Sequence, residues 1–375
     1  MDGWREASGP LPPSSSEGGA RGGGGEEEET EWLVSDESVM RTNDDATSAK
    51  LSCVERGYFE DGFVGHFVRQ RGGRAARRSP LVNRGYYARY AAVRRIVREF
   101  FAACGQQGGA GGVGGCQVIN LGAGFDTLYF SLKAAGEWPA GARMCELDFA
   151  DVAHRKASVV RRQAALAALV QAEDGRGDGV AALRAADYTL VGVDLRDAGA
   201  VNRAVFERAG FEAGAPTLVI SECVLIYLPP EKSDALVAWA RQAFASAVMV
   251  VYEQIRPHDS FGRQMVQNIH DRGCPLLGIH AYPELADQER RFRGAGWTGA
   301  VGLDMNAVYR HKLDPTDVRR IERLEIFDEF EEWNLIQAHY CIVVATVGGK
   351  GEGEGEGGGG GGPSWGSLSW FSKIN

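Results

Sequence analysis

Six short apolar runs, rich in β-branched residues, alternate with longer segments of helical periodicity, and this alternation constrains the fold more than any other feature. The apolar runs occupy 117–122, 143–148, 188–195, 217–222, 247–253 and 339–346. The helical patterns occupy 84–103, 151–170, 198–209, 231–245, 258–272 and 283–294. Because continuously apolar strands joined through helices are buried on both faces, the pattern predicts an α/β domain with a mostly parallel sheet. In such sheets a ligand binds beyond the carboxyl ends of the strands.

Glycine marks the ends of this domain. It makes up 51 of the 375 residues and concentrates in 1–30, 105–115 and 348–375. The two terminal segments cannot bury enough apolar area to offset chain entropy, so we predict disordered tails over 1–30 and 348–375 around one domain, 31–347. The last stretch, PSWGSLSWFSKIN, is either a docking peptide or an extension without a role. Residues 172–187 are interpreted as a flexible excursion.

Charge and cysteine usage exclude several classes of protein. The formal net charge is −9, whereas coating a nucleic acid needs a basic face. The arginines at 69–78 either form a local basic patch or belong to a solvated loop, and we favour the loop. Seven scattered cysteines, without zinc-type spacing, predict reduced thiols in a cytosolic or nuclear compartment, of which we favour a cytoplasmic location, and no metal site. The absence of long apolar runs and of a leader pattern predicts no membrane span and no signal peptide. The lack of heptads favours a monomer.

The first apolar run ends in the glycine turn NLGAGFDT. Gly122 and Gly124 remove side chains where the strand turns into a helix, so a ligand can approach the backbone amides. Thr127 stands where the third glycine of a full dinucleotide fingerprint would be, so the motif alone is weak evidence. A tight turn without any ligand stays open as the alternative.

Carboxylates follow the next three strands. Asp148 comes 26 residues after Gly122, where an acid accepts hydrogen bonds from ribose hydroxyls, although it could instead cap the following helix. Asp194 could accept a bond from an adenine amine, with Leu195 packed on the ring or offering its amide, and helix capping is again the alternative. Glu222 leaves an apolar strand, so we expect it to have a cationic partner. The set describes an adenosine-containing, partly cationic ligand.

Longer motifs carry a resemblance to a known family. They are TNDDATSAK (42–50), VNRGYYARY (82–90), NLGAGFDT, ELDF, GVDLRD (192–197), PTLVISECVLIY (216–227), YEQ (252–254), FGRQMVQN, RIERLEIFDE (320–329) and HYCIVVAT. Over about residues 40–347 the chain resembles the leucine carboxyl methyltransferase family. The resemblance implies a Rossmann-like class I methyltransferase fold, added helices that form a substrate lid, and S-adenosylmethionine as cofactor. It is greatest to members that methylate the C-terminal leucine carboxylate of the protein phosphatase 2A catalytic subunit.

The resemblance also implies roles for individual residues. Cofactor contacts would come from Lys50, Arg84, Gly122, Asp148, Asp194, Leu195 and Glu222. Arg84 would bind a carboxylate with its forked guanidinium. Tyr227 and Tyr252 would orient the substrate in its channel, with ordinary core packing as the alternative. No obligatory catalytic residue is expected, because a carboxylate is already ionised at neutral pH. The charged helices within 255–335 either face a partner or form a solvated surface.

Other functions remain open from the sequence. A small-molecule carboxyl methyltransferase would carry the same cofactor motifs. A tRNA-nucleoside methyltransferase of the family would carry a long β-propeller extension, which we do not expect in the 28 residues after 347. A phosphatase-binding adaptor without activity is disfavoured because Gly122, Asp148 and Arg84 are all present. A nicotinamide-dependent oxidoreductase is disfavoured by the missing third glycine.

Overall fold

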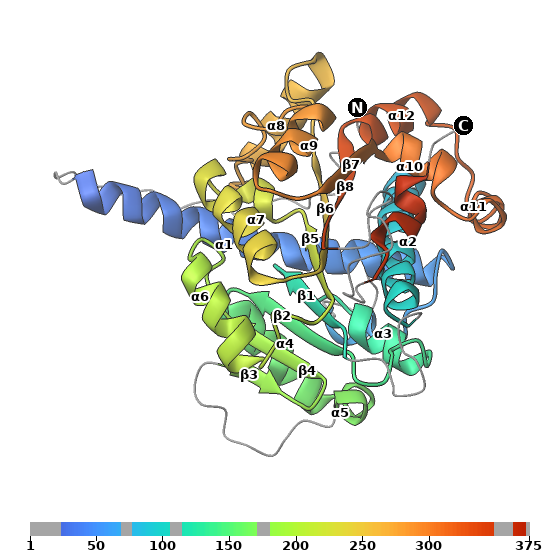
Figure 1. The fold of residues 1–375 in the computed structure, drawn as a ribbon. Helices are drawn as coiled ribbons and strands as arrows, with labels where there is room; N and C mark the ends of the chain where they lie inside the picture. The colour runs from blue at the N-terminus through green and yellow to red at the C-terminus, as the bar shows by residue number, and fades with distance from the viewer. Residues whose placement is uncertain (1–23, 69–76, 106–114, 171–180, 349–362, 373–375) are drawn as a thin grey trace, which may run out of the picture.

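A single eight-stranded sheet organises the computed structural model, which describes residues 24–68, 77–105, 115–170, 181–348 and 363–372, with side chains of the first helix from residue 36 onward. The strands are β1 (Gln117–Leu121), β2 (Arg143–Asp148), β3 (Ala181–Arg184), β4 (Tyr188–Gly192), β5 (Thr217–Glu222), β6 (Ala247–Gln254), β7 (Gly299–Asp304) and β8 (Tyr340–Val347). Their order across the sheet is β3-β4-β2-β1-β5-β6-β8-β7 (Figure 1).

The five central strands run parallel, as predicted. β4, β2, β1, β5 and β6 pair in parallel in that order, whereas β8 pairs antiparallel with both β6 and β7. The neighbours of β1 lead to opposite edges of the sheet, so a topological switch point lies between β1 and β5. The predicted fold class, a Rossmann-like and mostly parallel sheet of the class I methyltransferase type, is confirmed.

Two strands lie outside the six predicted runs, and both are at edges of the sheet. β3 pairs antiparallel with β4 through residues 181–184. The expectation of a flexible excursion over 172–187 is therefore wrong for these residues, while 171–180 lie outside the described part. β7 contains Gly299 and Gly302, which weaken the strand pattern in its sequence. The hydrogen-bonding edge of a neighbouring strand, rather than local propensity, stabilises each of these strands.

Helices cover both faces of the sheet. One face packs against α2 (Pro80–Gly105), α3 (Leu128–Ala134), α4 (Ala150–Arg162), α5 (Ala164–Val170), α10 (Met305–His311) and α12 (Phe330–Ala338). The other face packs against α6 (Ala198–Arg203) with the π-helical η3 (Ala204–Arg208), α7 (Pro230–Ala243) and α9 (Leu285–Gly294). Successive strand residues alternate between the two cores: Val250 packs in the first and Val251 in the second.

Further helices extend the domain. α8 (Ser260–His270) lies within the predicted helical pattern 258–272, whereas α1 (Gly24–Glu55) and α11 (Pro315–Ile321) lie outside the six predicted patterns, as do the short turns η2 (Val64–His66) and η4 (Leu225–Tyr227). Figure 1 shows α1 crossing the molecule and projecting beyond it at its N-terminal end. Because α1 begins at Gly24, the predicted tail over 1–30 extends too far; residues 1–23 are outside the described part. No helix in the described ranges combines the length and apolarity needed to cross a membrane.

The segment 363–372 is packed against the domain, which corrects the prediction of a disordered tail over all of 348–375. Its two turns, η5 (Trp365–Ser367) and η6 (Ser369–Phe371), contain Trp365 and Trp370, which are both buried. The Trp365 ring stacks on Phe100 of α2 with centroids 5.4 Å apart. Lys312 donates to the carbonyl oxygens of Ser369, Trp370 and Ser372 at 2.8–3.2 Å. Residues 106–114, in the predicted glycine-rich connection, and 349–362 are outside the described part.

We expect Trp365→Ala to lower the free energy of unfolding by about 3–5 kcal/mol, the usual cost of removing a buried tryptophan. The substitution removes the stacking on Phe100 and the indole hydrogen bond to the Val347 carbonyl oxygen at 3.1 Å. Urea unfolding measures the change. Ser367→Ala, in the same turn but exposed, is the control and should leave the midpoint nearly unchanged. Equal midpoints for the two variants would show that the segment does not contribute to the folded state.

Candidate active site

The glycine turn after β1 forms the floor of a cavity at the switch point. Gly122 and Gly124 have φ angles of +61° and +47°, in the left-handed region that favours glycine. A Cβ atom on Gly122 would lie 2.5 Å from a methyl group of Val224, and one on Gly124 would lie 2.5 Å from the side-chain oxygen of Asn43. Both positions therefore require glycine for conformation and for space.

One face of α1 forms the roof of this cavity. Its lining residues recur every three or four positions, which is the spacing of one helical face: Asp36, Val39, Met40, Asn43, Thr47 and Lys50, among others. Asn43 connects roof and floor, because its Oδ1 accepts a hydrogen bond from the backbone N–H of Phe125 at 2.7 Å. The cavity has a volume of about 290 Å³. The helix that covers it lies outside the alternating pattern.

Asp148, at the end of β2, contributes a buried carboxylate to the cavity. Its Oδ2 accepts from the N–H of Gly124 at 2.6 Å, and its Oδ1 accepts from the N–H of Phe149 at 2.8 Å. Burial raises the pKa of Asp148, and the two amide donors only partly oppose that effect. Helix α4 has Phe149 at its N-cap position without a side-chain cap. The helix-capping alternative for Asp148 is therefore not what the structure contains.

Asp194 follows β4 and lines the cavity together with Leu195. Burial by itself would raise the pKa of Asp194, but the hydrogen bonds from Arg196 outweigh it and lower the pKa. Arg196 also donates to both oxygens of Asp36 at 2.7–2.9 Å, so it ties the end of β4 to α1. The N-cap of α6 is Asp197, so Asp194 does not cap that helix.

Glu222, at the end of β5, pairs with Arg89 of α2 as the expectation of a cationic partner required. The Arg89 guanidinium also lies over the Tyr252 ring, 4.8 Å from its centroid, and over the Tyr86 ring at 5.7 Å. Burial would lower the pKa of Arg89, yet Glu222 and its other neighbours keep that pKa well above the ordinary value. Arg89 therefore stays protonated inside the site.

Arg84 does not line the cavity. Its guanidinium stacks 3.8 Å from the ring centroid of Phe327, and its side chain is buried there. Arg84 and Arg89 are five residues apart, which places them about 140° apart around an α-helix. When Arg89 faces the cavity, Arg84 faces Phe327 in the segment between α11 and α12 instead. The expectation that Arg84 contacts the cofactor does not fit this geometry.

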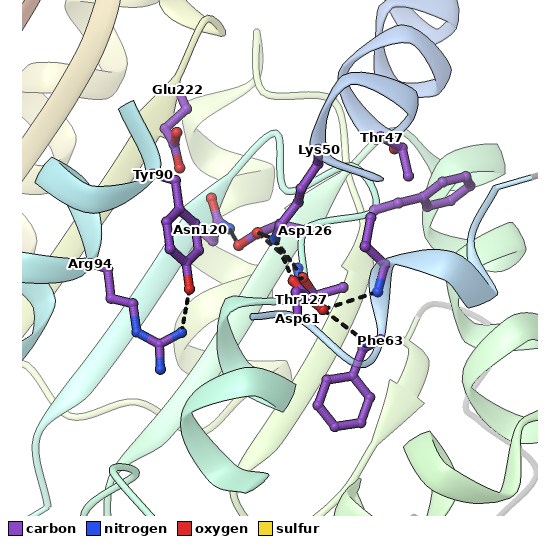
Figure 2. A network of polar contacts seen from close by, with 12 residues as sticks. Thr47, Lys50, Asp61, Phe63, Tyr90, Arg94, Asn120, Asp126, Thr127 and Glu222 are labelled. Carbon is purple, nitrogen blue, oxygen red and sulfur yellow. Dashed lines mark hydrogen bonds and ion pairs between the residues drawn. The ribbon is translucent and has the colours of Figure 1, made fainter. Parts of the chain in front are cut away.

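Lys50 lies at the centre of a polar network (Figure 2). Its ammonium donates to Thr127 Oγ1 at 2.5 Å and lies 3.1 Å from Asp61 Oδ2 and 3.3 Å from Asp126 Oδ1. Burial would lower the pKa of Lys50, but Asp126 and Asp61 outweigh it and raise the pKa. Asp61 also accepts the backbone N–H groups of Phe63 and Val64 at 2.8 and 3.0 Å. The network thus joins α1, the segment before η2 and the glycine turn.

The two predicted tyrosines have different positions. Tyr227 lines the cavity, whereas Tyr252 lies beside it, with its ring stacked on Tyr340 at 5.4 Å and facing Arg89. Burial holds the pKa of both Tyr227 and Tyr252 well above the ordinary value, so both hydroxyl groups can donate hydrogen bonds. Tyr252 therefore supports Arg89 rather than lining the cavity itself.

Cys223 is a further lining residue, and it has the left-handed φ of 56° that side chains rarely adopt. Burial raises the pKa of the Cys223 thiol to about 12, so it is protonated at neutral pH and is a poor nucleophile. Among the described residues, no group of His, Cys, Asp and Glu side chains could hold a metal ion. The chemistry of the cavity comes from its charges.

The lining includes five carboxylates, Asp36, Asp126, Asp148, Asp194 and Glu222, and three basic groups, Lys50, Arg89 and Arg196. The formal balance of −2 favours a ligand that carries positive charge. The glycine floor, which has no side chains, and the carboxylates at the strand ends fit a nucleoside with hydroxyl and amine donors.

Known proteins with a similar sequence identify this arrangement. A model of the family described as leucine carboxyl methyltransferase matches residues 38–241. A leucine carboxyl methyltransferase 1 homolog from Arabidopsis thaliana is 43% identical over 314 residues, which cover 84% of this chain and 90% of the relative. The chain belongs to the leucine carboxyl methyltransferase family. It is a methyltransferase, and the resemblance seen in the sequence is confirmed.

Two other relatives bear on its substrate. The leucine carboxyl methyltransferase 1 of Bos taurus is 34% identical over 320 residues, which cover 84% of this chain and 91% of the relative. The human tRNA wybutosine-synthesizing protein 4 is 45% identical over 313 residues, which cover 83% of this chain but 44% of that protein. Membership of the family therefore does not by itself identify the methyl acceptor.

The family motifs contain the site residues that sequence reasoning missed. Asn43 lies in TNDDATSAK, Arg89 in VNRGYYARY, Asp126 in NLGAGFDT and Arg196 in GVDLRD. Each motif identified the right segment, but only the packing of that segment shows which side chain reaches the cavity. Six of the seven predicted cofactor contacts line the same cavity, and Arg84 is the exception.

We expect Gly124→Ala to lower the stability more than Gly136→Ala does. Both residues have positive φ, +47° and +69°, which costs an alanine about 1–2 kcal/mol. Only the Cβ at position 124 would also meet a neighbour, the Asn43 oxygen at 2.5 Å, whereas nothing lies within 4 Å at Gly136. Urea unfolding of the two variants separates the two effects. Equal losses would show that the crowding between turn and roof is not significant.

Proposed function

We propose that this methyltransferase uses S-adenosylmethionine to methylate the C-terminal leucine α-carboxylate of the protein phosphatase 2A catalytic subunit, in the cytoplasm and as a monomer. The observation that carries the proposal is the cavity between roof and glycine turn. It combines carboxylates after three parallel strands, a half-buried Arg89–Glu222 pair and a net negative lining. The leucine carboxyl methyltransferases among its relatives support the choice of acceptor.

The residues present fit the cofactor. Gly122 and Gly124 form a floor without side chains, so the ligand can lie against the backbone. Asp148 would hold the ribose hydroxyls, and Asp194 with Leu195 would hold the adenine. Arg89 and Lys50 would hold the methionine carboxylate, and Glu222 or Asp126 would face its ammonium group. When bound, S-adenosylmethionine supplies a methyl group on a sulfonium, which an ionised carboxylate oxygen can accept.

The proposed reaction needs positioning rather than a catalytic base. A peptide α-carboxyl has a pKa of about 3.3–3.7, so it is ionised at neutral pH. One O–CH₃ bond forms while one S–CH₃ bond breaks, and no proton moves. Tyr227 lines the cavity and can donate its hydroxyl to orient the acceptor carboxylate. The contribution of the protein is alignment and exclusion of water, for which the α1 roof over the cavity is suited.

Arg89→Met and Arg84→Met distinguish the two arginines. We expect Arg89→Met to lower kcat/KM for S-adenosylmethionine at least 30-fold, about 2 kcal/mol, because it leaves Glu222 unpaired inside the site. Arg84→Met should stay within about threefold of the wild type, since Arg84 packs on Phe327 away from the cavity. Steady-state kinetics give both values, and the melting temperature of each variant controls for folding. The reverse order would return the cofactor role to Arg84.

The function is tested by incubation with radiolabelled S-adenosylmethionine and phosphatase 2A core enzyme, in parallel with a catalytic subunit that lacks its last leucine. We expect alkali-labile label on the intact subunit alone, because a methyl ester is hydrolysed by base. Cofactor binding by calorimetry without any label would point to a small-molecule acceptor or to an adaptor. No binding of cofactor would contradict the enzymatic proposal.

A second candidate is methylation of a carboxyl group on a tRNA nucleoside. It is favoured by the 45% identity to the human tRNA wybutosine-synthesizing protein 4. Bulk tRNA added as a third substrate in the same assay separates the two candidates. Label on tRNA but not on protein would replace the first proposal with the second.

Of the arginines predicted to form a solvated loop at 69–78, those between 69 and 76 are outside the described residues.

A further inference from the structure

One wall of the cavity is formed by the segment between β5 and α7. We call residues 223–228 the wall segment, and its members that line the cavity are Cys223, Val224, Tyr227 and Leu228. Val224 also packs on the glycine floor, because a Cβ atom on Gly122 would lie 2.5 Å from its methyl group. The position of the wall segment therefore decides how much space remains above the floor and where the Tyr227 hydroxyl lies.

The wall segment cannot hold its shape through its own hydrogen bonds alone. It begins at Cys223, whose φ of 56° is strained for a residue with a side chain. Its helical part is the three-residue turn η4, whose N-cap residue Val224 makes no side-chain hydrogen bond. Because the first N–H groups of a helical turn have no partner within the turn, other groups must accept them.

The end of β6 provides these acceptors. Glu253 Oε1 accepts the backbone N–H of Ile226 at 2.8 Å, and the same carboxylate accepts from the N–H groups of the two preceding residues. The carbonyl oxygen of Tyr252 accepts the N–H of Cys223 at 2.7 Å. Glu253 is 1% exposed and does not line the cavity. Its effect on the cavity therefore passes through the wall segment.

The titratable groups that face Glu253 come from three elements. Burial raises the pKa of Glu253 to about 7, and Arg291 of α9 together with the accepted N–H groups opposes that effect only in part. Arg291 is also held by Asp234 of α7, to which its Nε donates at 2.8 Å. The thiols of Cys223, in the wall segment, and Cys341, on β8, also face the carboxylate. Burial raises the pKa of both thiols, so neither is charged at neutral pH.

The charge of Glu253 decides how well it holds the wall segment. An ionised carboxylate is only an acceptor, whereas a carboxylic acid has an O–H donor and gives up part of its capacity to accept. Hydrogen bonds to an ionised acceptor are roughly twice as strong as those between neutral groups. Since three N–H groups donate to this one side chain, they favour its ionised form, and protonation loosens the wall segment.

We propose that Glu253 is a positioning residue for methyl transfer, and that its carboxylate holds the wall segment, with Tyr227, in the place that binding of S-adenosylmethionine requires. The inference rests on the proposed function for the identity of the cofactor. It adds a residue that lies outside the cavity and makes the affinity for the cofactor depend on pH. The ionised form favours binding, so the affinity rises as the pH rises through about 7.

Glu253→Gln tests the inference, because glutamine has nearly the shape of the protonated side chain and cannot ionise. We expect its Kd for S-adenosylmethionine, measured by calorimetry, to exceed that of the wild type about tenfold at pH 8 but only about twofold at pH 6, where most wild-type molecules are protonated. The ratio of the two values cancels the titration of the cofactor and of the carboxylates in the cavity. Glu253→Asp keeps the charge but is one methylene shorter, so it too should weaken binding at pH 8.

Stability separates positioning from a merely structural role. Burial raises the pKa of Glu253 from 4.5 to about 7 in the folded state, so the folded protein binds the proton more tightly than the unfolded chain does. The stability that this proton contributes is lost as the pH rises through about 7. From pH 6 to pH 8 the melting temperature of the wild type should therefore fall relative to that of Glu253→Gln, while its advantage in binding grows. A residue that served only the fold would change both in the same direction.

A matched control and a direct measurement complete the test. Glu289→Gln is the control, because Glu289 accepts the backbone N–H of Gly302 at 2.9 Å and neither residue lines the cavity. Its Kd should equal that of the wild type at both pH values. Hydrogen exchange at pH 8, followed by mass spectrometry, should be faster in Glu253→Gln than in the wild type for the peptide that contains residues 223–228.

The inference is overturned if Glu253→Gln binds S-adenosylmethionine as tightly as the wild type does at pH 8. A ratio of Kd values that stays tenfold at pH 6 would overturn the dependence on ionisation, since the defect would then come from the amide itself. If the wild type binds no S-adenosylmethionine, the proposed function fails. The exchange rates would still show whether Glu253 holds the wall segment, so the two failures are distinguishable.

Discussion

The ammonium of Lys50, enclosed between Asp61, Asp126 and Thr127, is the interaction on which the rest of the site depends. A charge removed from water is stable in a protein only when partners surround it, and breaking such a group leaves the remaining charges uncompensated. Here the partners come from three parts of the chain: α1, the segment before η2 and the turn after β1. The contacts among these partners hold α1, the roof of the cavity, against the glycine turn that forms its floor, although α1 has no hydrogen-bonded ladder to the sheet.

A second ion pair, the half-buried Arg89 with Glu222, connects α2 to β5. The two pairs have a common consequence, because each places a cation and an anion beside the strand ends where a zwitterionic ligand would lie. The additional carboxylates after β2 and β4 give the cavity its negative balance. Electrostatic arrangement of this kind can discriminate a cationic ligand from a neutral one without any ionisable group acting as acid or base. The protonated thiol of Cys223 is consistent with such a site.

Much of the fold could be predicted from local patterns. The bounds predicted for β2 and β5 are those observed. Each is an apolar run of the kind that forms a buried parallel strand, and the acidic residue at its end marks where the strand stops. The edge strands β3 and β7 could not be found this way, since pairing with a neighbour rather than local sequence stabilises them. The segment around Trp365 and Trp370 is a similar case. Its polar and glycine-rich surroundings predict disorder, but the two indole rings gain enough buried area against α2 and β7 to hold it on the domain.

The sequence by itself determined which segments build the site: the glycine turn, the acids that follow three strands, and the motifs that belong to the leucine carboxyl methyltransferase family. A strand that ends in a turn leaves its next residue at the edge of the sheet, so Asp148, Asp194 and Glu222 could be placed from their order along the chain. Only the tertiary structure decided which residues of α1 and α2 face the cavity. The rotation of a helix about its axis is set by how it packs on its neighbours. Arg89 and Arg84 are five residues apart on α2, so Arg89 lines the cavity while Arg84 packs on Phe327.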